Sequence, residues 1–365
     1  MIVGGGPAGL ATAIRLKQLE KKDGKEIRVC LLDKGSELGS HILSGNCFET
    51  EGFSKLFPDW ETMPEGEKPP INQKVTKDTF KILFGKNTSI TIPEFLLPPQ
   101  IHNGKNYILS LARLCNWMGE KAQELGVDVF TGFAADEFVY DETKKFIKGI
   151  ATVDTGIDKN WKPKSGFQRG MELHAKQLVL AEGARGSLTE RAIKEFSLRS
   201  SCDEQTYGIG LKEVWEVPED KLQPGLVEHT VGFPLSQDVY GGSYMYHEAP
   251  NRIHLGYVVG LDYKNPYLNP YLEFQRWKTH HEVSKYLKDG KCIKYGARAL
   301  NEGGFFSVPK LTFPGGLLVG CGAGFLNVAK IKGANAAIIS GTVAAESIYY
   351  TLHYGEYQPG LEISQ

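Results

Sequence analysis

The segment GGGPAGL, residues 4 to 10, spaces three glycines as G-x-G-x-x-G directly after the apolar pair Ile2-Val3. Residues 8 to 20 follow with an apolar stripe of roughly 3.6-residue period, which predicts a helix. A second apolar run, residues 27 to 35, carries the acid Asp33 near its end and predicts a buried strand. Strand, glycine turn, helix and strand form a βαβ unit, so the chain is predicted to contain a dinucleotide-binding fold.

Each part of this loop has a physical reason to bind a dinucleotide. The first glycine permits the tight turn, the second lets backbone amides approach a pyrophosphate, and the third lets the helix pack on the strand. The helix N-terminus adds partial positive charge, and the acid after the second strand can accept hydrogen bonds from the adenosine ribose. FAD and NAD both use this unit, so the loop alone leaves both open. The predicted residues are Gly4, Gly6, Pro7, Ala8, Gly9, Asp33 and Lys34.

Two later segments favour FAD. Residues 173 to 188 contain an apolar strand that runs into a small-residue turn around Gly183. Residues 315 to 348 contain a last strand, a turn at Gly320-Cys321, and a helix rich in small residues that begins near Gly333-Ala334. The N-terminal amides of such a helix can stabilise negative charge on a reduced isoalloxazine ring. Many flavin hydroxylases carry Gly-Asp where this chain has Gly-Cys, so the contact of that acid with the ribityl chain is not expected here.

Composition argues against several other classes. A chain of 365 residues is long for one core, so two domains are expected. Lys and Arg number 42 and Asp and Glu number 43, so no basic excess indicates nucleic acid as a partner. None of the six cysteines forms a C-x2-C pair, and no metal site is predicted within the chain. The longest apolar run, residues 315 to 329, is too short and too rich in glycine to span a bilayer.

Several longer segments go beyond the dinucleotide motif. They include LFPDW (56 to 60), QTYGIGLKE (205 to 213), VYGGSYMYH (239 to 247), YGARALNEGG (295 to 304) and PKLTFPGGLLVGC (309 to 321). In these segments, and over nearly all of its length, the chain resembles the electron-transfer-flavoprotein:ubiquinone oxidoreductase family. The resemblance implies an FAD-dependent oxidoreductase, with reduced electron-transfer flavoprotein as donor and ubiquinone as acceptor, that links fatty-acid and amino-acid oxidation to the respiratory chain. It adds Ser44 and Gly45 of the LSG segment to the predicted FAD contacts, which also include Gly183, Gly320, Cys321, Gly333 and Ala334.

The ends of the chain depart from this family. The family has an extension before the glycine loop, whereas this chain starts within the first predicted strand. The family also continues into a domain whose cysteines hold a [4Fe-4S] cluster. Truncated ends are therefore expected, and the cluster is expected only in the intact protein because its ligands are not in this chain.

The resemblance also implies where quinone and membrane would sit. Gly241 and Gly242 correspond to the family's quinone-contacting glycines, with Tyr240 beside them; without the resemblance, a glycine-rich turn between strands would be favoured. A prenyl quinone lives in the bilayer, so a flavoprotein that reduces it must place an apolar surface on one leaflet. Two segments are expected to do this, with burial in the core as the alternative for both. They contribute Phe53, Leu56, Phe57 and Trp60 on a short helix, and Phe95, Leu96 and Leu97 on a proline-rich loop.

The predicted fold is α/β with an α+β second domain. A Rossmann-like FAD-binding domain of the glutathione-reductase and hydroxylase type is expected over residues 1–70, 103–190 and 300–365. A quinone-binding, membrane-contacting domain on an antiparallel sheet is expected over residues 71–102 and 191–299. Helices are predicted over residues 107 to 125 and 270 to 287, and strands over 207 to 217 and 252 to 261. No catalytic side chain is predicted, because the flavin carries the redox chemistry.

Two other functions stay open. One is a flavin-dependent reductase of isoprenoid lipids, of the geranylgeranyl type, which has a similar fold. The other is a truncated FAD-binding remnant with an assembly or interaction role. The expected partners are electron-transfer flavoprotein, ubiquinone, a monotopically contacted membrane surface and respiratory-chain complexes, with no nucleic acid. The expected location is the matrix face of the mitochondrial inner membrane, or the cytoplasmic membrane face in a bacterium.

Overall fold

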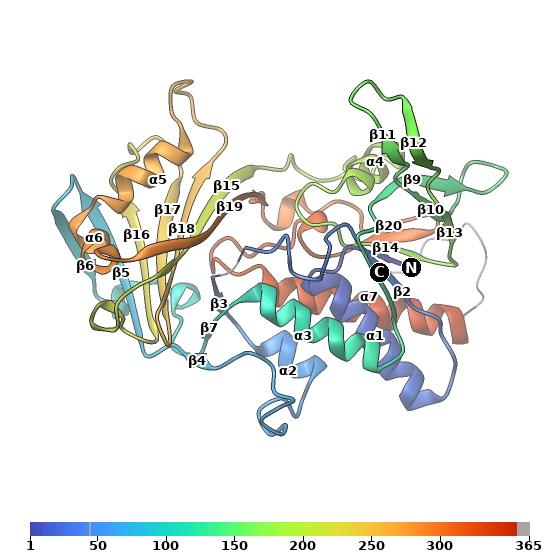
Figure 1. The fold of residues 1–365 in the computed structure, drawn as a ribbon, viewed down its shortest axis with the longest axis horizontal. Helices are drawn as coiled ribbons and strands as arrows, with labels where there is room; N and C mark the ends of the chain where they lie inside the picture. The colour runs from blue at the N-terminus through green and yellow to red at the C-terminus, as the bar shows by residue number, and fades with distance from the viewer. Residues whose placement is uncertain (44, 356–365) are drawn as a thin grey trace.

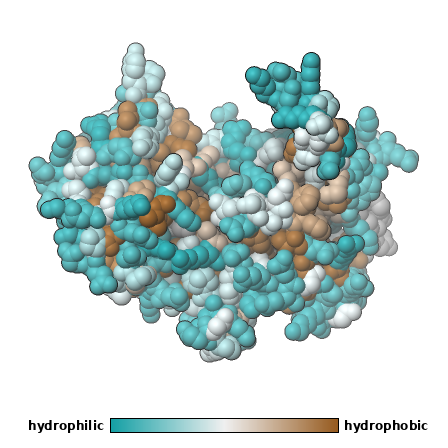
Figure 2. Space-filling model, viewed as in Figure 1, coloured by the Kyte–Doolittle hydropathy of each residue, from teal (hydrophilic) through white to brown (hydrophobic). Residues whose placement is uncertain are grey.

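The computed structural model describes residues 1–43 and 45–355, so the predicted contact Ser44 lies outside the described residues. The molecule has two lobes side by side, each with its own large sheet (Figure 1). In space-filling view a recess separates the upper parts of the lobes (Figure 2). The predicted α/β class with a second, mainly antiparallel unit is confirmed. No helix within the described ranges is long and apolar enough to cross a bilayer.

The first lobe contains a six-stranded sheet in the order β20-β21-β14-β1-β2-β8, parallel except for its edge strand β20. Neighbouring residues along each strand alternate between two cores: Ile2 and Leu31 face one cluster, and Val3 and Leu32 face the other. The sheet is therefore covered on both faces, as expected for a parallel sheet. Its strands are β1 (Ile2–Val3), β2 (Cys30–Asp33), β8 (Asp128–Thr131), β14 (Leu178–Leu180), β20 (Thr312–Phe313) and β21 (Gly316–Leu318).

Three helices cover the first of these faces: α1 (Pro7–Asp23), α3 (Leu111–Glu124) and α7 (Ala334–Tyr354) (Figure 1). Helix α1 begins with Pro at its first turn and ends at Gly24, which has a left-handed φ of 70°. Helices α1 and α7 approach closely because both present small residues, and a Cβ on Gly341 would overlap the Ala8 carbonyl oxygen. The small-residue composition of the last helix thus allows close packing against the helix that follows the glycine loop.

The opposite face is covered by a smaller sheet and a helix. The sheet, in the order β13-β10-β9, consists of β9 (Ala135–Tyr140), β10 (Ile147–Thr152) and β13 (Glu172–His174), and the helix is α4 (Ser187–Glu195). A two-stranded ribbon, β11 (Thr155–Ile157) and β12 (Pro163–Gln168), projects from this side as a hydrophilic arm (Figures 1 and 2). The expected domain boundary at residue 190 falls within α4. Because Ala192 and Leu198 belong to the core of this lobe, we propose a boundary near residue 200.

The second lobe is a seven-stranded sheet in the order β19-β15-β18-β17-β16-β5-β6, in which only the β16–β5 pair is parallel. The strands predicted at 207 to 217 and 252 to 261 are β15 and β18. Helices α5 (Pro270–Lys278) and α6 (His281–Leu287) cover one face through Phe274, Trp277 and Val283. The strands are β5 (Lys77–Phe84), β6 (Thr88–Ile92), β15 (Tyr207–Glu216), β16 (Leu226–Gly232), β17 (Gly241–Glu248), β18 (Arg252–Gly260) and β19 (Lys291–Asn301).

Two predicted helices differ from the structure. The helix expected over 107 to 125 begins only at Leu111, because Ser110 is extended and caps it through its side chain. Residues Tyr107–Leu109 form β7, which pairs with β3 (Asn46–Phe48) and β4 (Gln73–Lys74). The helix expected over 270 to 287 is broken at His280, whose extended backbone ends α5 and whose ring accepts the amide of Glu282 to cap α6.

Candidate functional site

The glycine loop has the geometry of a pyrophosphate cradle. Gly4 has a φ of 109°, and a Cβ there would overlap the carbonyl oxygen of Ala181 in the neighbouring strand turn. A Cβ on Gly9 would overlap the Gly4 carbonyl, whereas nothing lies within 4 Å of a Cβ built on Gly6. Gly6 is also the N-cap of α1 and has no side-chain cap, so the first amides of the helix face open space.

Asp33 shapes this loop from the end of β2. Its Oδ2 accepts the amide of Gly5 at 2.7 Å, and its Oδ1 accepts the amide of Gly35 at 2.7 Å. A carboxylate has about four acceptor positions, so both oxygens keep capacity for ribose hydroxyls. The predicted ribose contact therefore stays compatible with the geometry, while Lys34 beside it is exposed.

A second helix end converges on the same region. Gly333 is the N-cap of α7 without a side-chain cap, and no acid occupies the first turn. Gly320, with a φ of 63°, sits against Ala8 of α1, where a built Cβ would lie 2.9 Å from the Ala8 Cβ, and its amide donates to Ser340 Oγ at 3.0 Å. The predicted residues Gly320, Gly333 and Ala334 thus lie on elements that pack directly against the glycine-loop helix.

Cys321 stands where many flavin hydroxylases carry an acid. It contributes a backbone carbonyl and a thiol to its surroundings. The Cys321 carbonyl accepts the side-chain amide of Asn301 at 2.6 Å. Burial raises the pKa of the Cys321 thiol, which keeps it neutral. Asn301 Oδ1 and Gln205 Nε2 are both buried with no hydrogen-bond partner in the described part of the chain. These two atoms leave one acceptor and one donor at the junction of the lobes for a ligand or an ordered water.

The residue set therefore fits FAD. An open helix end and a glycine without neighbours suit the pyrophosphate, a carboxylate with spare acceptors suits the ribose, and α7 offers free amides to the isoalloxazine ring. Gly183, after β14, has a φ of 87° and lies against the guanidinium of Arg298 from the second lobe. Its neighbour Glu182 caps α4 by accepting the amide of Thr189 at 2.7 Å, so that turn is held from both sides.

The second lobe turns a sheet face rich in glycine toward this region. Arg298 reaches Gly183, and Lys212 donates to the carbonyl of Gly45 at 3.3 Å, so this face turns toward the first lobe. Cross-strand register places paired residues on one face. By that register, the face carries the glycines Gly208 and Gly210 of β15, Gly242 of β17, Gly256 and Gly260 of β18, and Gly296 of β19.

Within this face, Gly242 and Gly210 leave a glycine floor, whereas the Tyr244 ring covers Gly256 and the Glu302 carboxylate meets Gly208. Gly242, Val258, Gly210 and Arg298 form one row across four strands of this face. Gly241 points to the opposite face, where a Cβ would lie 2.6 Å from Leu235 Cδ1. The two glycines predicted together are thus the first residues of β17 and serve different faces, and only Gly242 belongs to the floor. Tyr240 beside them is 56% exposed.

A buried aromatic group borders this floor. The Tyr244 ring covers Gly256 and stacks on Tyr246, with ring centroids 4.5 Å apart. Tyr246 Oη lies 3.0 Å from His229 Nε2, while His229 Nδ1 is buried without a partner among the described residues. Burial lowers the pKa of His229 to about 3, so the imidazole is neutral at physiological pH. The His229–Tyr246 pair is therefore a neutral hydrogen bond, with the Lys212 ammonium 5.8 Å from the neighbouring Tyr244 ring.

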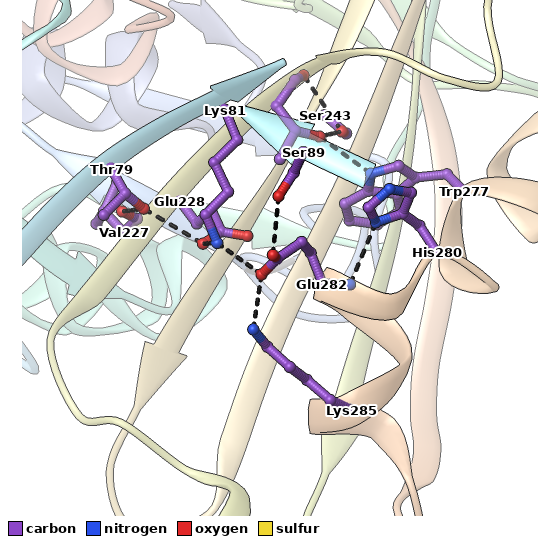
Figure 3. Close-up of polar contacts among 11 residues, drawn as sticks. Thr79, Lys81, Ser89, Val227, Glu228, Ser243, Trp277, His280, Glu282 and Lys285 are labelled. Atoms are coloured by element: carbon purple, nitrogen blue, oxygen red, sulfur yellow. Dashed lines mark hydrogen bonds and ion pairs between the residues drawn. The ribbon is translucent and has the colours of Figure 1, made fainter. Parts of the chain in front are cut away.

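The helix-covered face of the same sheet holds a charged network (Figure 3). Lys81 of β5 lies between Glu228 of β16 and Glu282 of α6, and its Nζ is 2.8 Å from Glu282 Oε2. Glu282 also accepts Ser89 of β6 at 2.9 Å and Lys285 at 2.6 Å. The start of α6 therefore holds both strands of the β5–β6 hairpin, and the backbone amide of His281 adds a bond to the Lys86 carbonyl at 2.9 Å.

Four of the seven expected membrane contacts are wrong. Phe53, Leu56, Phe57 and Trp60, on and after α2 (Glu51–Leu56), are no more than 8% exposed and belong to the core of the first lobe. Phe53 and Phe57 pack against Trp117 of α3, with ring centroids 5.8 and 5.0 Å apart. The apolar stripe of α2 is covered by protein, so it is not available to lipid.

The other predicted segment is exposed. Phe95 is 84% and Leu96 64% exposed, on the 3-10 turn η1 (Glu94–Leu96), and Leu97 is partly buried. Phe84 and Ile90 of the β5–β6 hairpin are also exposed and lie on the glycine-bearing face of the sheet. Sequence reasoning missed this hairpin, together with Arg298 and Lys212. The alternation of glycines in YGIGLKE was the signal that could have indicated the glycine-bearing face.

Two family models match the chain. Residues 1–208 match the pyridine nucleotide-disulphide oxidoreductase family, and residues 207–300 match the ubiquinone-binding family of ETF-QO. The boundary between the two matches coincides with the start of β15, where the second sheet begins. The glycine floor lies within the second match.

Over the whole of this chain, its sequence is similar to curated proteins. It is 52% identical to the mitochondrial electron transfer flavoprotein-ubiquinone oxidoreductase of Mus musculus, over 100% of this chain and 60% of that protein. It is 50% identical to the protein of that name from Homo sapiens, again over 100% and 60%, and 52% identical to that from Caenorhabditis elegans, over 96% and 58%. The chain thus spans about three-fifths of the length of these relatives.

Solved structures share the fold. A geranylgeranyl bacteriochlorophyll reductase-like protein from Thermoplasma acidophilum superposes with a TM-score of 0.69 at 17% identity, covering 98% of this chain and 79% of that one. The flavin-dependent brominase Bmp2 superposes with a TM-score of 0.62 at 17% identity, covering 98% and 80%. At such identities the likeness concerns architecture alone.

Proposed function

Because the chain belongs to the pyridine nucleotide-disulphide oxidoreductase family and is a relative of electron transfer flavoprotein-ubiquinone oxidoreductase, we propose that it is the flavin- and quinone-binding part of such an enzyme. It would pass electrons from reduced electron-transfer flavoprotein to ubiquinone. The observation that supports this most directly is the glycine floor, which lies within the segment matched by the ubiquinone-binding model and faces the dinucleotide-binding lobe. The iron–sulfur cluster that the resemblance implies would be held outside this chain.

The residues of the first lobe would bind and orient FAD. The amides at the start of α1 would hold the pyrophosphate, Asp33 the ribose, and the amides at the start of α7 the pyrimidine edge of the ring. FAD in this position supplies one-electron and two-electron redox chemistry, so it can connect a one-electron donor to a two-electron acceptor. The protein's part is placement of the two ring systems, because no side chain has to form a bond with either.

The residues of the second lobe would place the quinone. Gly242 leaves its backbone unobstructed, so a flat ring can lie on the floor beside Val258 and Gly210. A Cβ built on Gly242 would contact Val231 Cγ1 at 3.4 Å, and Val231 pairs with Ile82, which pairs with Ile90. These apolar residues share the floor's face and form a track to the sheet edge. Such a track suits a prenyl tail that enters from a bilayer.

The exposed apolar residues around this edge would contact one leaflet. They are Phe84, Ile90, Phe95 and Leu96, each at least 49% exposed. Water-exposed aromatic and aliphatic side chains gathered at the end of an apolar track are typical of a membrane contact. The relatives are named mitochondrial proteins, so we propose a mitochondrial location, with this edge against the matrix face of the inner membrane.

The test is stopped-flow reoxidation. The bound FAD is reduced chemically without oxygen and mixed with a short-chain ubiquinone. We expect rapid reoxidation whose rate saturates with quinone concentration. Absence of reoxidation with FAD still bound would contradict a quinone site within this chain. Turnover of a prenyl lipid in place of quinone would support the lipid-reductase alternative, and a chain that binds no FAD would support the remnant alternative.

A further inference from the structure

A polar cavity lies beside the exposed loop. It has a volume of about 390 Å³ and is bounded by η1 and η2 (Pro99–Ile101), the residues that follow them, the end of β3, and the turn before α7. Its charged and titratable lining residues are Glu49, Glu94, His102, Lys105, Lys330 and Lys332. None of the sites described above uses this cavity.

Lys332 is the unusual member of this lining. It is only 5% exposed, and its Nζ donates to the backbone carbonyl of Lys330 at 3.0 Å. Across the described ranges, no carboxylate lies within 4.0 Å of its Nζ. A buried ammonium group without a counter-ion is costly, because desolvation is not offset by an ion pair. Burial lowers the pKa of Lys332 for that reason, and Cys47, Asp78 and Glu49 offset the effect only in part.

The acids near the cavity are already engaged or turned outward. Glu49 accepts Lys330 Nζ at 2.8 Å through one oxygen and Asn335 Nδ2 at 3.0 Å through the other. Asp78 accepts two bonds from Asn103, at 2.7 and 3.1 Å. The Glu94 side chain is 67% exposed and lies 4.0 Å from the His102 ring. The ammonium groups of Lys332 and of the exposed Lys105 therefore remain for an anion.

The anion would have several acceptor oxygens, since the cavity offers donors from separate segments. A phosphate group meets this requirement and fits easily within the cavity. The segment that lines the cavity through Glu94 also carries the exposed apolar residues Phe95 and Leu96. A phosphate bound in the cavity would thus have apolar side chains next to it.

We propose that this cavity binds the phosphate of an anionic phospholipid, whose head group carries no compensating ammonium, with Lys332 and Lys105 as its cationic partners and Phe95-Leu96 beside the acyl chains. The proposal rests on the membrane contact proposed above and specifies its chemistry. The protein's membrane-contacting surface would then combine a cationic site with the neighbouring apolar side chains. Membrane binding would depend on anionic lipid as well as on insertion of these side chains into the bilayer.

The test is vesicle flotation of the FAD-loaded chain. The vesicles consist of phosphatidylcholine with or without a minor fraction of phosphatidylglycerol. We expect stronger binding with the anionic lipid, and about fivefold weaker binding for Lys332→Met and for Lys105→Gln, the effect of one basic residue near an anionic surface. Lys159→Gln is the matched control, since Lys159 is exposed on the β11–β12 arm of the other lobe. Equal binding by wild type, Lys332→Met and Lys105→Gln would overturn the proposal.

Two further measurements separate the outcomes. Calorimetric titration with inorganic phosphate measures anion binding to the cavity without a membrane. If Lys332→Met loses phosphate binding but keeps its vesicle binding, the lipid assignment is overturned in favour of free phosphate. Lys105 lies on the rim, so Lys105→Gln should keep its FAD absorbance and its reoxidation by short-chain ubiquinone. If wild type also fails to be reoxidised, the quinone proposal has failed. The lipid site is then still tested by the difference in flotation between wild type and the two lysine variants.

Discussion

The guanidinium of Arg298 in β19 packs directly against Gly183 after β14, so a residue of the quinone-side sheet reaches the FAD-side strand turn. The contact exists because Gly183 lacks a side chain and adopts a φ of 87°. One backbone position thus serves the turn beside the glycine loop and the junction of the two lobes.

Replacement of Gly183 by Ala should therefore weaken FAD binding and lower the melting temperature. The new Cβ would displace Arg298, and a non-glycine residue at this φ costs about 1 kcal/mol before any clash. FAD content after gel filtration and thermal unfolding are the measurements. Gly85→Ala is the control, since Gly85 has a φ of 56° and nothing within 4 Å of a built Cβ, so it reports the backbone strain alone. Equal FAD loss in both variants would contradict a role for the Arg298 contact.

Replacement of Gly242 by Leu should leave FAD bound and abolish reoxidation by quinone. The added side chain would stand on the floor between Val258 and Val231, where the ring is proposed to lie. We expect a loss of more than about tenfold in the saturating rate, measured by stopped flow. The control is Gly66→Leu, at an exposed position with no neighbour within 4 Å. Unchanged reoxidation by the Gly242 variant would refute the assignment of the floor.

Replacement of Glu282 by Gln should destabilise the second lobe by about 3 kcal/mol, because Lys81 would lose one of its two carboxylate partners and Lys285 would lose its own, in a largely buried setting. Urea unfolding measures this loss. Glu51→Gln, which breaks an exposed pair with Lys55, should cost less than about 1 kcal/mol. A comparable loss in both variants would show that burial of the network is unimportant.

The same carboxylate predicts an acid-sensitive component of stability. Burial alone would raise the pKa of Glu282, but hydrogen bonds from Lys285, Lys81 and Ser89 outweigh it and lower the pKa to about 2. A folded-state pKa below the unfolded value of about 4.3 gives stabilisation that is present above pH 4.3 and is lost as the pH falls toward 2. The free energy of unfolding of wild type should approach that of Glu282→Gln over this range. A constant difference between them would contradict the shift.

Replacement of Phe95 and Leu96 together by Ser should reduce binding to phosphatidylcholine vesicles at least about tenfold, since each buried apolar side chain contributes about 1.5 kcal/mol or more. Flotation measures the effect. Trp161→Ser is the control, because Trp161 is 85% exposed but lies on the β11–β12 arm of the opposite lobe. A larger effect of Trp161→Ser would show that the first lobe contacts the membrane and would contradict our proposal.

Local sequence patterns were enough to predict the glycine turn and the buried strands of the first lobe. The spacing of Gly4, Gly6 and Gly9 predicted the turn because only glycine suits a φ of 109° and the close approach of helix to strand. The apolar runs predicted β14 and β21, since strands covered on both faces are continuously apolar. The helix predicted over 107 to 125 started too early because a cap such as Ser110 acts within one turn, a finer scale than hydrophobic period.

The aromatic stripe of α2 shows what a local sequence pattern cannot predict. An apolar helix face indicates that something covers it, but its sequence does not distinguish lipid from protein. Trp117, which lies more than fifty residues along the chain from Phe57, decides the matter by packing on it. The loop at Phe95 had a similar composition and stayed exposed because no distant segment folds over it.

Sequence by itself determined the dinucleotide loop, the class of fold and the resemblance to a quinone-reducing flavoprotein, because each depends on residues close together in the chain. Tertiary structure alone decided that glycines from four strands share one face, that Arg298 meets Gly183, and that Lys332 is buried beside a cavity. These relations join segments separated by tens to hundreds of residues. Their register is set by hydrogen bonding between strands and by core packing, which no local window of sequence contains.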